Sequence, residues 1–383
     1  MITYNRSDNR NVLMDDFSRE YVVDSNISEL NKKKANAVFK SYDEYKSYIY
    51  QIDYLDTVYY NVTYLCNLHC PYCYAPRNTH FVSQENNIAF LKKLVELKAK
   101  NIVLIGGEPM MHPKLEKLID EMIFYGFTSI SIITNGTILK EKVLEKIVKY
   151  HIDIQISVDG YTEETNAPTR GKGSLKKVLK NIDILKQHNV NYSVMQVLTK
   201  ETIKYSEEFS IFFSNKGIPH GFFLVKETDD ASRPSLKSIY KLYDFLFSRY
   251  GDVNKVFDCV KSSDQMQLNS TGFPITHCGA GITTLSIDPL GNVYPCVKLH
   301  NGDFKITNLI NSTAVTDIKN NRNRVLENEL VNSLKKCKNC SIKYICGGGC
   351  RAEEYYVSKN NQSYSQCDIQ KGNLTYFLEN INE

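Results

Sequence analysis

The sequence predicts an α/β protein built on an open, partial (β/α)6 TIM-like barrel, followed by a loop-rich region with many cysteines. Two observations support this fold class. Between residues 57 and 250, short apolar runs alternate six times with amphipathic helical patterns, as in repeated βα units. Beyond residue 260 this alternation gives way to loops rich in Gly and Cys. In such a barrel the functional groups lie on the loops that follow the strands.

The elements of the barrel are predicted in order along the chain. The strands are residues 57–64, 101–105, 128–133, 152–157, 192–198 and 220–225. The helices begin near Ser83 and at Pro113, and then cover residues 139–150, 174–186, 201–215 and 235–250. In the helix at 174–186, for example, Leu175, Val178 and Ile182 recur at helical spacing and form one apolar face.

The regions on either side of the barrel are predicted as separate parts. Residues 1–56 form an N-terminal extension with one strand at 21–23 and a Lys-rich helix at 27–50. The barrel domain spans 57–250. Residues 251–383 form a cysteine-bearing domain that ends in a helix, and we expect metal ligands to replace a hydrophobic core there.

The composition indicates a cytoplasmic protein that does not bind nucleic acid or membranes. Lys and Arg number 47 against 43 Asp and Glu, which is a balanced charge. The N-terminus has no apolar core of a signal peptide, and no later run reaches a membrane-spanning length. The chain has 11 cysteines, an odd and high number, and clustered thiols in a reducing compartment more often bind metal or do redox chemistry than form disulfides.

Three of these cysteines stand close together directly after the first strand. Cys66, Cys70 and Cys73 have the spacing C-x3-C-x2-C. Three thiolates hold three irons of a 4Fe-4S cluster and leave the fourth iron open to a ligand. A zinc site is the alternative, since thiolates suit that metal too. The spacing, together with the aromatic Tyr72, closely resembles the radical SAM superfamily, in which S-adenosylmethionine (SAM) binds the open iron and is reductively cleaved.

Three further loops carry residues that the resemblance connects with SAM. Gly106, Gly107, Glu108 and Pro109 follow the second strand and match the GGEP motif, which contacts the amino group of the methionine part of SAM. Asn135 follows the third predicted strand. Ser157 ends the fourth, and Asp159 lies two residues beyond it. The resemblance implies that these loops hold the ribose and methionine parts of SAM, although all three side chains are also common turn formers. The related pattern has His-Asp before Arg-Gly, whereas here Thr165 and Asn166 precede Arg170 and Gly171.

The C-terminal cysteines form a second pattern. From Gly291 onward, their spacing resembles the SPASM domain, which carries two auxiliary 4Fe-4S clusters. By this resemblance one cluster has the ligands Cys278, Cys296 and Cys350, and the other has Cys337, Cys340, Cys346 and Cys367. Cys259 is the candidate fourth ligand of the first auxiliary cluster. Three cysteines at the SAM-binding cluster and four at each auxiliary cluster then account for all 11 cysteines. The alternative for Cys259 is a buried packing residue. The alternative for the seven cysteines of the SPASM pattern is structural zinc.

The resemblance implies a maturase for a ribosomally made peptide. Its cofactors are three 4Fe-4S clusters and SAM, and its product is an oxidised or crosslinked side chain. The implied partners are the precursor peptide and a low-potential electron donor of flavodoxin or ferredoxin type. A separate leader-binding protein is a further expected partner, since 56 residues are too short for a complete leader-binding domain. The rivals are an anaerobic sulfatase maturase, which typically has an Asp base where this chain has Val297, and a non-catalytic iron-sulfur scaffold or electron carrier. No catalytic residue is assigned beyond the radical SAM cluster.

Overall fold

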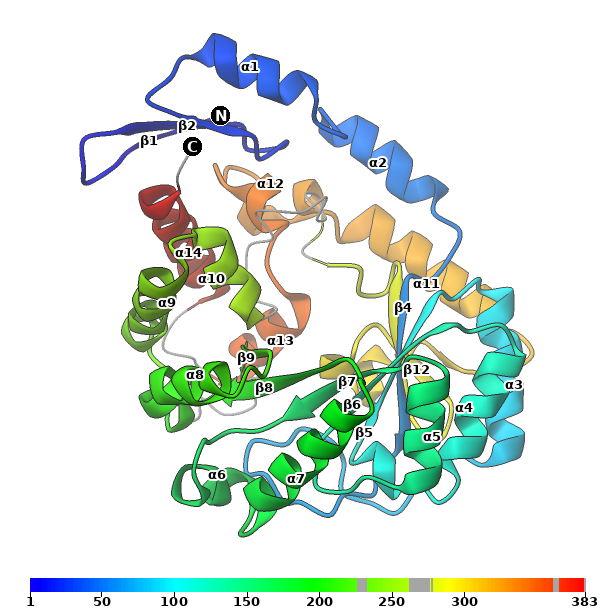
Figure 1. Cartoon of the computed structure of the whole chain (residues 1–383). Coiled ribbons are helices and arrows are strands. Elements are labelled where there is room, and N and C mark those ends of the chain that lie inside the picture. Colours follow the sequence, from blue (N-terminus) through cyan, green and yellow to red (C-terminus); the bar gives the residue numbers. More distant parts are fainter. Residues whose placement is uncertain (226–232, 262–275, 277, 361–364, 382–383) are drawn as a thin grey trace. The chain divides into compact units, whose positions relative to one another are not determined.

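The computed structural model describes residues 1–225, 233–261, 276, 278–360 and 365–381 (Figure 1). Contacts divide the chain into two compact units. The barrel unit comprises Asp53–Pro234 and Ala280–Arg322, and the terminal unit comprises Met1–Ile52, Ser235–Gly279 and Asn323–Glu383. The predicted domains at 1–56, 57–250 and 251–383 stay a prediction, and the contacts add that residues 280–322 pack with the barrel strands.

A parallel sheet forms the centre of the barrel unit. Its six strands pair in chain order, each parallel to the next. They are β4 (Thr57–Thr63), β5 (Asn101–Gly106), β6 (Ser129–Thr134), β7 (Asp153–Ser157), β8 (Tyr192–Leu198) and β9 (His220–Leu224). The predicted α/β class with six βα units is confirmed, and each strand lies within two residues of its predicted bounds.

Helices follow the strands and bury their apolar faces. They are α3 (Gln84–Glu96), α4 (Leu115–Phe124), α5 (Glu141–Lys149), α6 (Glu163–Arg170), α7 (Ser174–Gln187) and α8 (Ser206–Asn215). Ser83 caps α3 as predicted, because its side chain accepts a hydrogen bond from Asn86 N. The predicted start of α4 at Pro113 is wrong: the His112 ring accepts a hydrogen bond from Lys114 N, and the helix begins after that turn.

Two further differences concern helices. The helix predicted at 201–215 is a 3-10 turn, Thr202–Tyr205, followed by α8, because the Thr202 hydroxyl donates to Val197 O and fixes a separate turn. The sequence pattern did not predict α6, which contains Pro168. A capping box between Thr162 and Thr165 starts this helix and outweighs the proline.

Beside β4, three short strands from the cysteine-bearing region extend the parallel sheet, where the sequence pattern predicted only loops. They are β11 (Thr284–Ile287), β12 (Asn292–Tyr294) and β13 (Thr307–Asn308). β11 pairs in parallel with β4, and β12 and β13 continue the sheet in antiparallel pairs. The edge of β4 is therefore covered, since an open edge strand leaves its backbone N–H and C=O groups unpaired.

The terminal unit combines both ends of the chain. Its strands form an antiparallel sheet in the order β1 (Ile2–Asn5), β2 (Asn11–Met14) and β3 (Tyr21–Val23), of which only β3 was predicted. The single helix predicted at 27–50 is two helices, α1 (Ile27–Ala35) and α2 (Tyr42–Gln51), because Asn36 ends the first and Ser41 caps the second. The other helices of this unit are α9 (Leu236–Tyr250), α10 (Val253–Cys259), α12 (Lys343–Cys346), α13 (Arg351–Asn360) and α14 (Gln366–Asn380), and α11 (Ala314–Asn328) crosses the unit boundary. No helix within the described ranges combines the length and the hydrophobicity that a membrane crossing requires.

Candidate active site

The cysteine loop, residues 66–73, follows β4 at the carboxyl end of the parallel sheet. Cys66 is half-buried, Cys70 is buried and Cys73 is exposed. Burial raises the pKa of the Cys66 and Cys70 thiols, so a thiolate at either position needs a metal or a cation to stabilise it. Among the described residues, no group of three or more His, Cys, Asp or Glu side chains has metal-binding geometry. The three cysteines therefore remain predicted cluster ligands.

The start of the cysteine loop is tied to the loop after β6. Asn135 Nδ2 donates to Asn67 Oδ1 at 2.9 Å and lies 4.0 Å from Cys66 Sγ. Asn67 in turn donates to the Thr137 hydroxyl at 2.8 Å. Leu68 N donates to Cys66 Sγ at 3.4 Å. Asn135, predicted to bind SAM, thus contacts the cysteine loop directly.

Gly106 and Gly107 bring the end of β5 against the backbone just before Cys66. A Cβ atom on Gly106 would lie 2.1 Å from Thr63 O, and one on Gly107 would lie 2.3 Å from Leu65 O. Gly107 N donates to Thr63 O, and Glu108 N donates to Leu65 O, both at 2.7 Å. Only glycine permits this approach, so the two glycines of the motif have a structural reason besides any contact with SAM.

Glu108 is fully buried at the end of this motif. Its Oε1 accepts hydrogen bonds from the Thr134 hydroxyl at 2.6 Å and from Met110 N at 3.0 Å, and its Oε2 accepts one from Asn135 N at 2.7 Å. Burial raises the pKa of Glu108, and these donors, Thr134 first among them, oppose that rise. A carboxylate has about four lone-pair positions, so three are used and one on Oε2 remains for a further donor such as an ammonium group.

Ser157 and Pro109 complete the set of residues that were predicted to bind SAM. Ser157 is the last residue of β7 and is half-buried. Pro109 is buried and begins a 3-10 turn that Glu108 caps by accepting a hydrogen bond from Met110 N. All six predicted residues lie on loops or strand ends at the carboxyl edge of the sheet, as in other barrels of this type.

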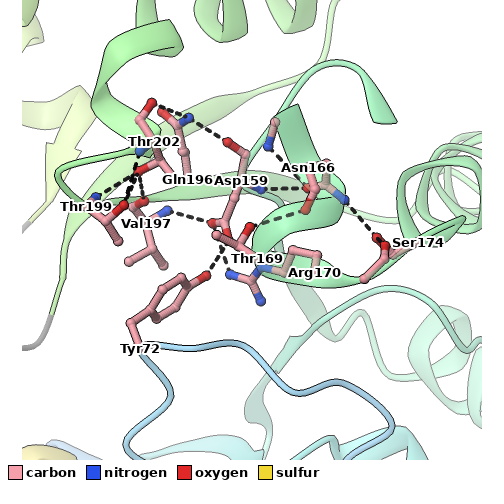
Figure 2. Close-up of polar contacts among 12 residues, drawn as sticks. Tyr72, Asp159, Asn166, Thr169, Arg170, Ser174, Gln196, Val197, Thr199 and Thr202 are labelled. Atoms are coloured by element: carbon pink, nitrogen blue, oxygen red, sulfur yellow. Dashed lines mark hydrogen bonds and ion pairs between the residues drawn. The ribbon is translucent and has the colours of Figure 1, made fainter. Parts of the chain in front are cut away.

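Sequence reasoning did not assign a role to the buried network around Asp159 (Figure 2). Arg170 pairs with the Asp159 carboxylate through Nε at 2.7 Å and through Nη2 at 3.2 Å. The Tyr72 hydroxyl, from the cysteine loop, also donates to this carboxylate. The available signals were the acidic residue after the fourth strand and the Arg-Gly pair, but the sequence does not reveal that they meet.

A second group that sequence reasoning missed joins β4 to residues near Cys296. The His300 ring stacks on Tyr294 with 4.4 Å between ring centroids. One ring nitrogen lies 2.7 Å from the Ser286 hydroxyl, and the other lies 3.4 Å from the Tyr64 hydroxyl. Asn61 donates to the same Ser286 at 3.3 Å. Val297, at the position of the base in sulfatase maturases, begins a 3-10 turn between these residues.

The predicted second auxiliary set lies together in the terminal unit. The pKa of Cys346 is raised to about 11, chiefly by burial, with smaller contributions from the neighbouring Cys337, Cys367 and Cys340 and an opposing hydrogen bond from Gly348. These four cysteines remain predicted cluster ligands. Of the predicted first set, Cys259, Cys278 and Cys350 belong to the terminal unit and Cys296 to the barrel unit. None of the 11 cysteines, all of which are described, forms a disulfide.

Comparisons with known proteins define the class. The family model of the radical SAM superfamily matches residues 60–210, and that of SPASM, an iron-sulfur cluster-binding domain, matches residues 278–341. An uncharacterized protein of Methanocaldococcus jannaschii is 33% identical over 254 residues, which cover 62% of this chain and 83% of that protein. The chain belongs to the radical SAM superfamily and carries a SPASM domain. These domains imply a SAM-binding 4Fe-4S cluster and auxiliary clusters.

Among curated relatives, the mycofactocin maturase MftC of Mycolicibacterium smegmatis is 24% identical over 315 residues, which cover 78% of each chain. Two solved structures share the fold. AnSMEcpe with bound AdoMet has a TM-score of 0.65 at 18% identity and covers 84% of this chain and 93% of its own. Streptococcus suis SuiB bound to the precursor peptide SuiA has a TM-score of 0.65 at 16% identity and covers 90% of this chain and 81% of its own.

Proposed function

We propose that this chain is a radical SAM/SPASM maturase that oxidatively modifies or crosslinks side chains of a ribosomally made precursor peptide. The observation that carries this proposal is the combination of both domains with relatives named for such work. MftC is named as a maturase and resembles the chain over 78% of its length, and SuiB is described with a precursor peptide.

The residues at the carboxyl edge of the sheet fit the proposed cofactor. Cys66, Cys70 and Cys73 would hold the SAM-binding cluster, and thiolates are the ligands that such clusters require. Glu108 supports the binding of the SAM amino group, because its Oε2 retains one acceptor position after three hydrogen bonds. When bound, the cluster and SAM supply a 5′-deoxyadenosyl radical that removes a hydrogen atom from the substrate.

The chain itself orients this site. Gly106 and Gly107 let the Glu108 backbone pair with residues just before Cys66, and Pro109 fixes the turn that follows. Asn135 and Ser157 are proposed to contact the ribose and methionine parts of SAM. Two proposed auxiliary clusters would take the ligands Cys259, Cys278, Cys296 and Cys350, and Cys337, Cys340, Cys346 and Cys367.

The rival functions have less support. A sulfatase maturase would need a base at the place of Val297, whose side chain cannot accept a proton. A non-catalytic scaffold or electron carrier has no need of a glutamate with an unused acceptor position beside a three-cysteine loop. The proposed partners are a low-potential electron donor and, for leader recognition, a separate protein. We infer a cytoplasmic site of action, because exposed thiols such as Cys73 and Cys367 persist in a reducing compartment.

The test uses a candidate precursor peptide, sought as a short open reading frame beside this gene. Anaerobic enzyme, SAM, a low-potential reductant and this peptide should give 5′-deoxyadenosine and a product lighter by about two hydrogens, the mass change of a two-electron oxidation. Tandem mass spectrometry then locates the modified side chain. Conversion of a sulfatase-derived Cys peptide to formylglycine, with no change in the precursor, would establish the rival function.

A further inference from the structure

The far end of the cysteine loop has its own attachment to the barrel. Tyr72 stands between Cys70 and Cys73, and its hydroxyl donates a hydrogen bond to Asp159 Oδ2 on the loop after β7 (Figure 2). The two residues are 87 positions apart in the sequence. A phenol is protonated at neutral pH, so the hydroxyl donates and the carboxylate accepts. This is a charge-assisted hydrogen bond, which is stronger than one between neutral groups.

The acceptor is held in place from several sides. Asp159 is fully buried, and its carboxylate also accepts hydrogen bonds from Arg170 Nε and Nη2 and, at 3.2 Å, from Val197 N of β8. Burial disfavours the charged form of Arg170, but Asp159 outweighs this and raises the pKa of the guanidinium. The carboxylate therefore forms a neutralised pair whose position β8 and the end of α6 determine.

The main chain of Asp159 is fixed as well. Asn166 Oδ1 accepts hydrogen bonds from Asp159 N at 3.0 Å and from Gly160 N at 3.2 Å, and Gln196 Nε2 donates to Asp159 O at 2.7 Å. Asn166 Nδ2 donates to the Ser174 hydroxyl at 2.8 Å. Asn166 thus connects the loop after β7 to the start of α7, as Figure 2 shows.

We propose that the Tyr72 hydroxyl is a positioning group for SAM binding: it fixes the Cys70–Cys73 end of the loop against Asp159, as Asn135 and Asn67 fix the Cys66 end. The Tyr72 ring also lies over the Arg170 guanidinium, with 5.7 Å from its Cζ to the ring centroid. The inference rests on the proposed cluster ligands Cys66, Cys70 and Cys73, but it does not depend on the peptide substrate. Neither end of the loop belongs to a strand or helix, so these side chains determine where its thiols lie.

The consequence is a prepared site for SAM. Without the hydroxyl, the loop end populates positions in which the open iron and Glu108 do not bind SAM together. The apparent dissociation constant for SAM then rises in inverse proportion to the fraction of the enzyme that remains in the competent form. Return of the Cys70–Cys73 end of the loop to the position that binds SAM then becomes part of the binding step. The SAM-bound state itself is unchanged. The effect therefore falls on KM for SAM and not on kcat.

The experiment compares Tyr72→Phe with wild type and with Tyr205→Phe as the matched control. Tyr72→Phe keeps the ring over Arg170 and leaves Asp159 with the Arg170 and Val197 hydrogen bonds, so the protein folds. Tyr205→Phe also loses one hydroxyl hydrogen bond, which Tyr205 donates to Thr165 O of α6 at 2.8 Å. That bond does not involve the cysteine loop. The measurements are bound iron after anaerobic reconstitution, the EPR spectrum of the reduced cluster with and without SAM, and KM and kcat for SAM cleavage without peptide.

Tyr72→Phe should bind as much iron as wild type, with KM for SAM raised about tenfold and kcat changed by less than about twofold, since one charge-assisted hydrogen bond is lost before SAM binds. At a SAM concentration that just saturates wild type, the EPR spectrum of Tyr72→Phe should show a mixture of SAM-bound and SAM-free clusters. A KM for SAM equal to that of wild type and Tyr205→Phe would show that Tyr72 only packs. Loss of iron would show that the hydroxyl retains the cluster. Either outcome contradicts the inference. Wild type without iron at residues 66–73 would contradict the proposed cluster site itself, and an unmodified peptide would contradict only the proposed function.

Discussion

The two cysteine-bearing segments of this chain are held in different ways. The cysteine loop at 66–73 follows a long parallel strand and is tied at both ends to neighbouring strand loops, through Asn135 and through Tyr72. The segment at 337–350 has only short helical turns, the longest being the four residues of α12. There the Arg351 guanidinium donates to the backbone oxygens of Gly348 and Gly349, at 2.7 and 3.0 Å.

This difference indicates different roles for the metal. Parallel strand pairing holds the barrel frame, so a cluster at the cysteine loop would serve chemistry more than folding. In the C-terminal segment few regular hydrogen bonds hold the chain, and Gly347, Gly348 and Gly349 all have positive φ. A segment of this kind draws much of its folding free energy from metal ligation. The predictions below test this comparison, beginning with the largest expected effect.

Removal of iron should affect the two segments unequally. After anaerobic chelation, backbone amides of β4 to β8 should stay protected from hydrogen exchange, whereas those of residues 337–350 should exchange as in an unfolded chain, because ligation is coupled to folding there. Exchange measured by mass spectrometry on peptic fragments tests this, with iron-loaded protein as the control. Equal protection of both segments after chelation would remove the distinction.

Asp159→Asn should destabilise the barrel frame by about 3–5 kcal/mol, the usual cost of leaving one partner of a buried ion pair without its counter-charge. Arg170 is the group left uncompensated, since it pairs with Asp159 at 2.7 Å and is itself buried. Denaturant unfolding monitored by circular dichroism gives the free energy of unfolding. Glu201→Gln, at an exposed ion pair with Lys204, is the control and should leave the midpoint unchanged. A loss for Asp159→Asn as small as that of the control would mean that the network does not stabilise the frame.

Gly291→Ala should destabilise the protein by about 1–3 kcal/mol through overpacking. A Cβ atom at Gly291, where φ is 83°, would lie 2.5 Å from the Phe90 ring of α3. This change tests whether residues 280–322 belong with the barrel in solution. Gly126→Ala, where φ is 92° and no atom lies within 4 Å of the added Cβ, is the matched control, because it shares the backbone strain without the contact. If both variants lose the same free energy of unfolding, the turn between β11 and β12 does not pack on α3.

Cys259→Ala should have the smallest effect on SAM cleavage, because Cys259 ends α10 in the terminal unit and is proposed only as an auxiliary ligand. The rate of 5′-deoxyadenosine formation should stay at the wild-type value, while iron content falls or the auxiliary-cluster spectrum shifts. Anaerobic iron analysis and EPR spectroscopy measure both. Unchanged iron and spectra would identify Cys259 as a packing residue.

The sequence predicted the barrel well because hydrophobic periodicity is strong there. The bounds of β8 were predicted without error, and Ser83 and Ser235 were correctly placed at helix starts. The strands β11 to β13 were missed because two to four residues carry no periodic signal. Their pairing with β4 depends on an edge that only the folded sheet presents.

The candidate site was predicted in part. Spacing and the order of motifs identified the cysteines and the GGEP residues, since those lie near one another along the chain. The contacts of Tyr72 with Asp159, and of Tyr64 with His300, join residues 87 and 236 positions apart. No local pattern specifies such pairs, because barrel topology alone brings these loops together.

The most direct test of the account is the reductive cleavage of SAM by the anaerobically reconstituted full chain, compared with the triple variant Cys66→Ala, Cys70→Ala, Cys73→Ala. Wild type with a low-potential reductant should release 5′-deoxyadenosine, measured by liquid chromatography. The variant should release none and should hold about four irons fewer, as expected for one lost 4Fe-4S cluster, while keeping the circular dichroism of wild type because the barrel frame does not need iron. Continued formation of 5′-deoxyadenosine by the variant, or tightly bound zinc and no iron chromophore in wild type, would contradict the account.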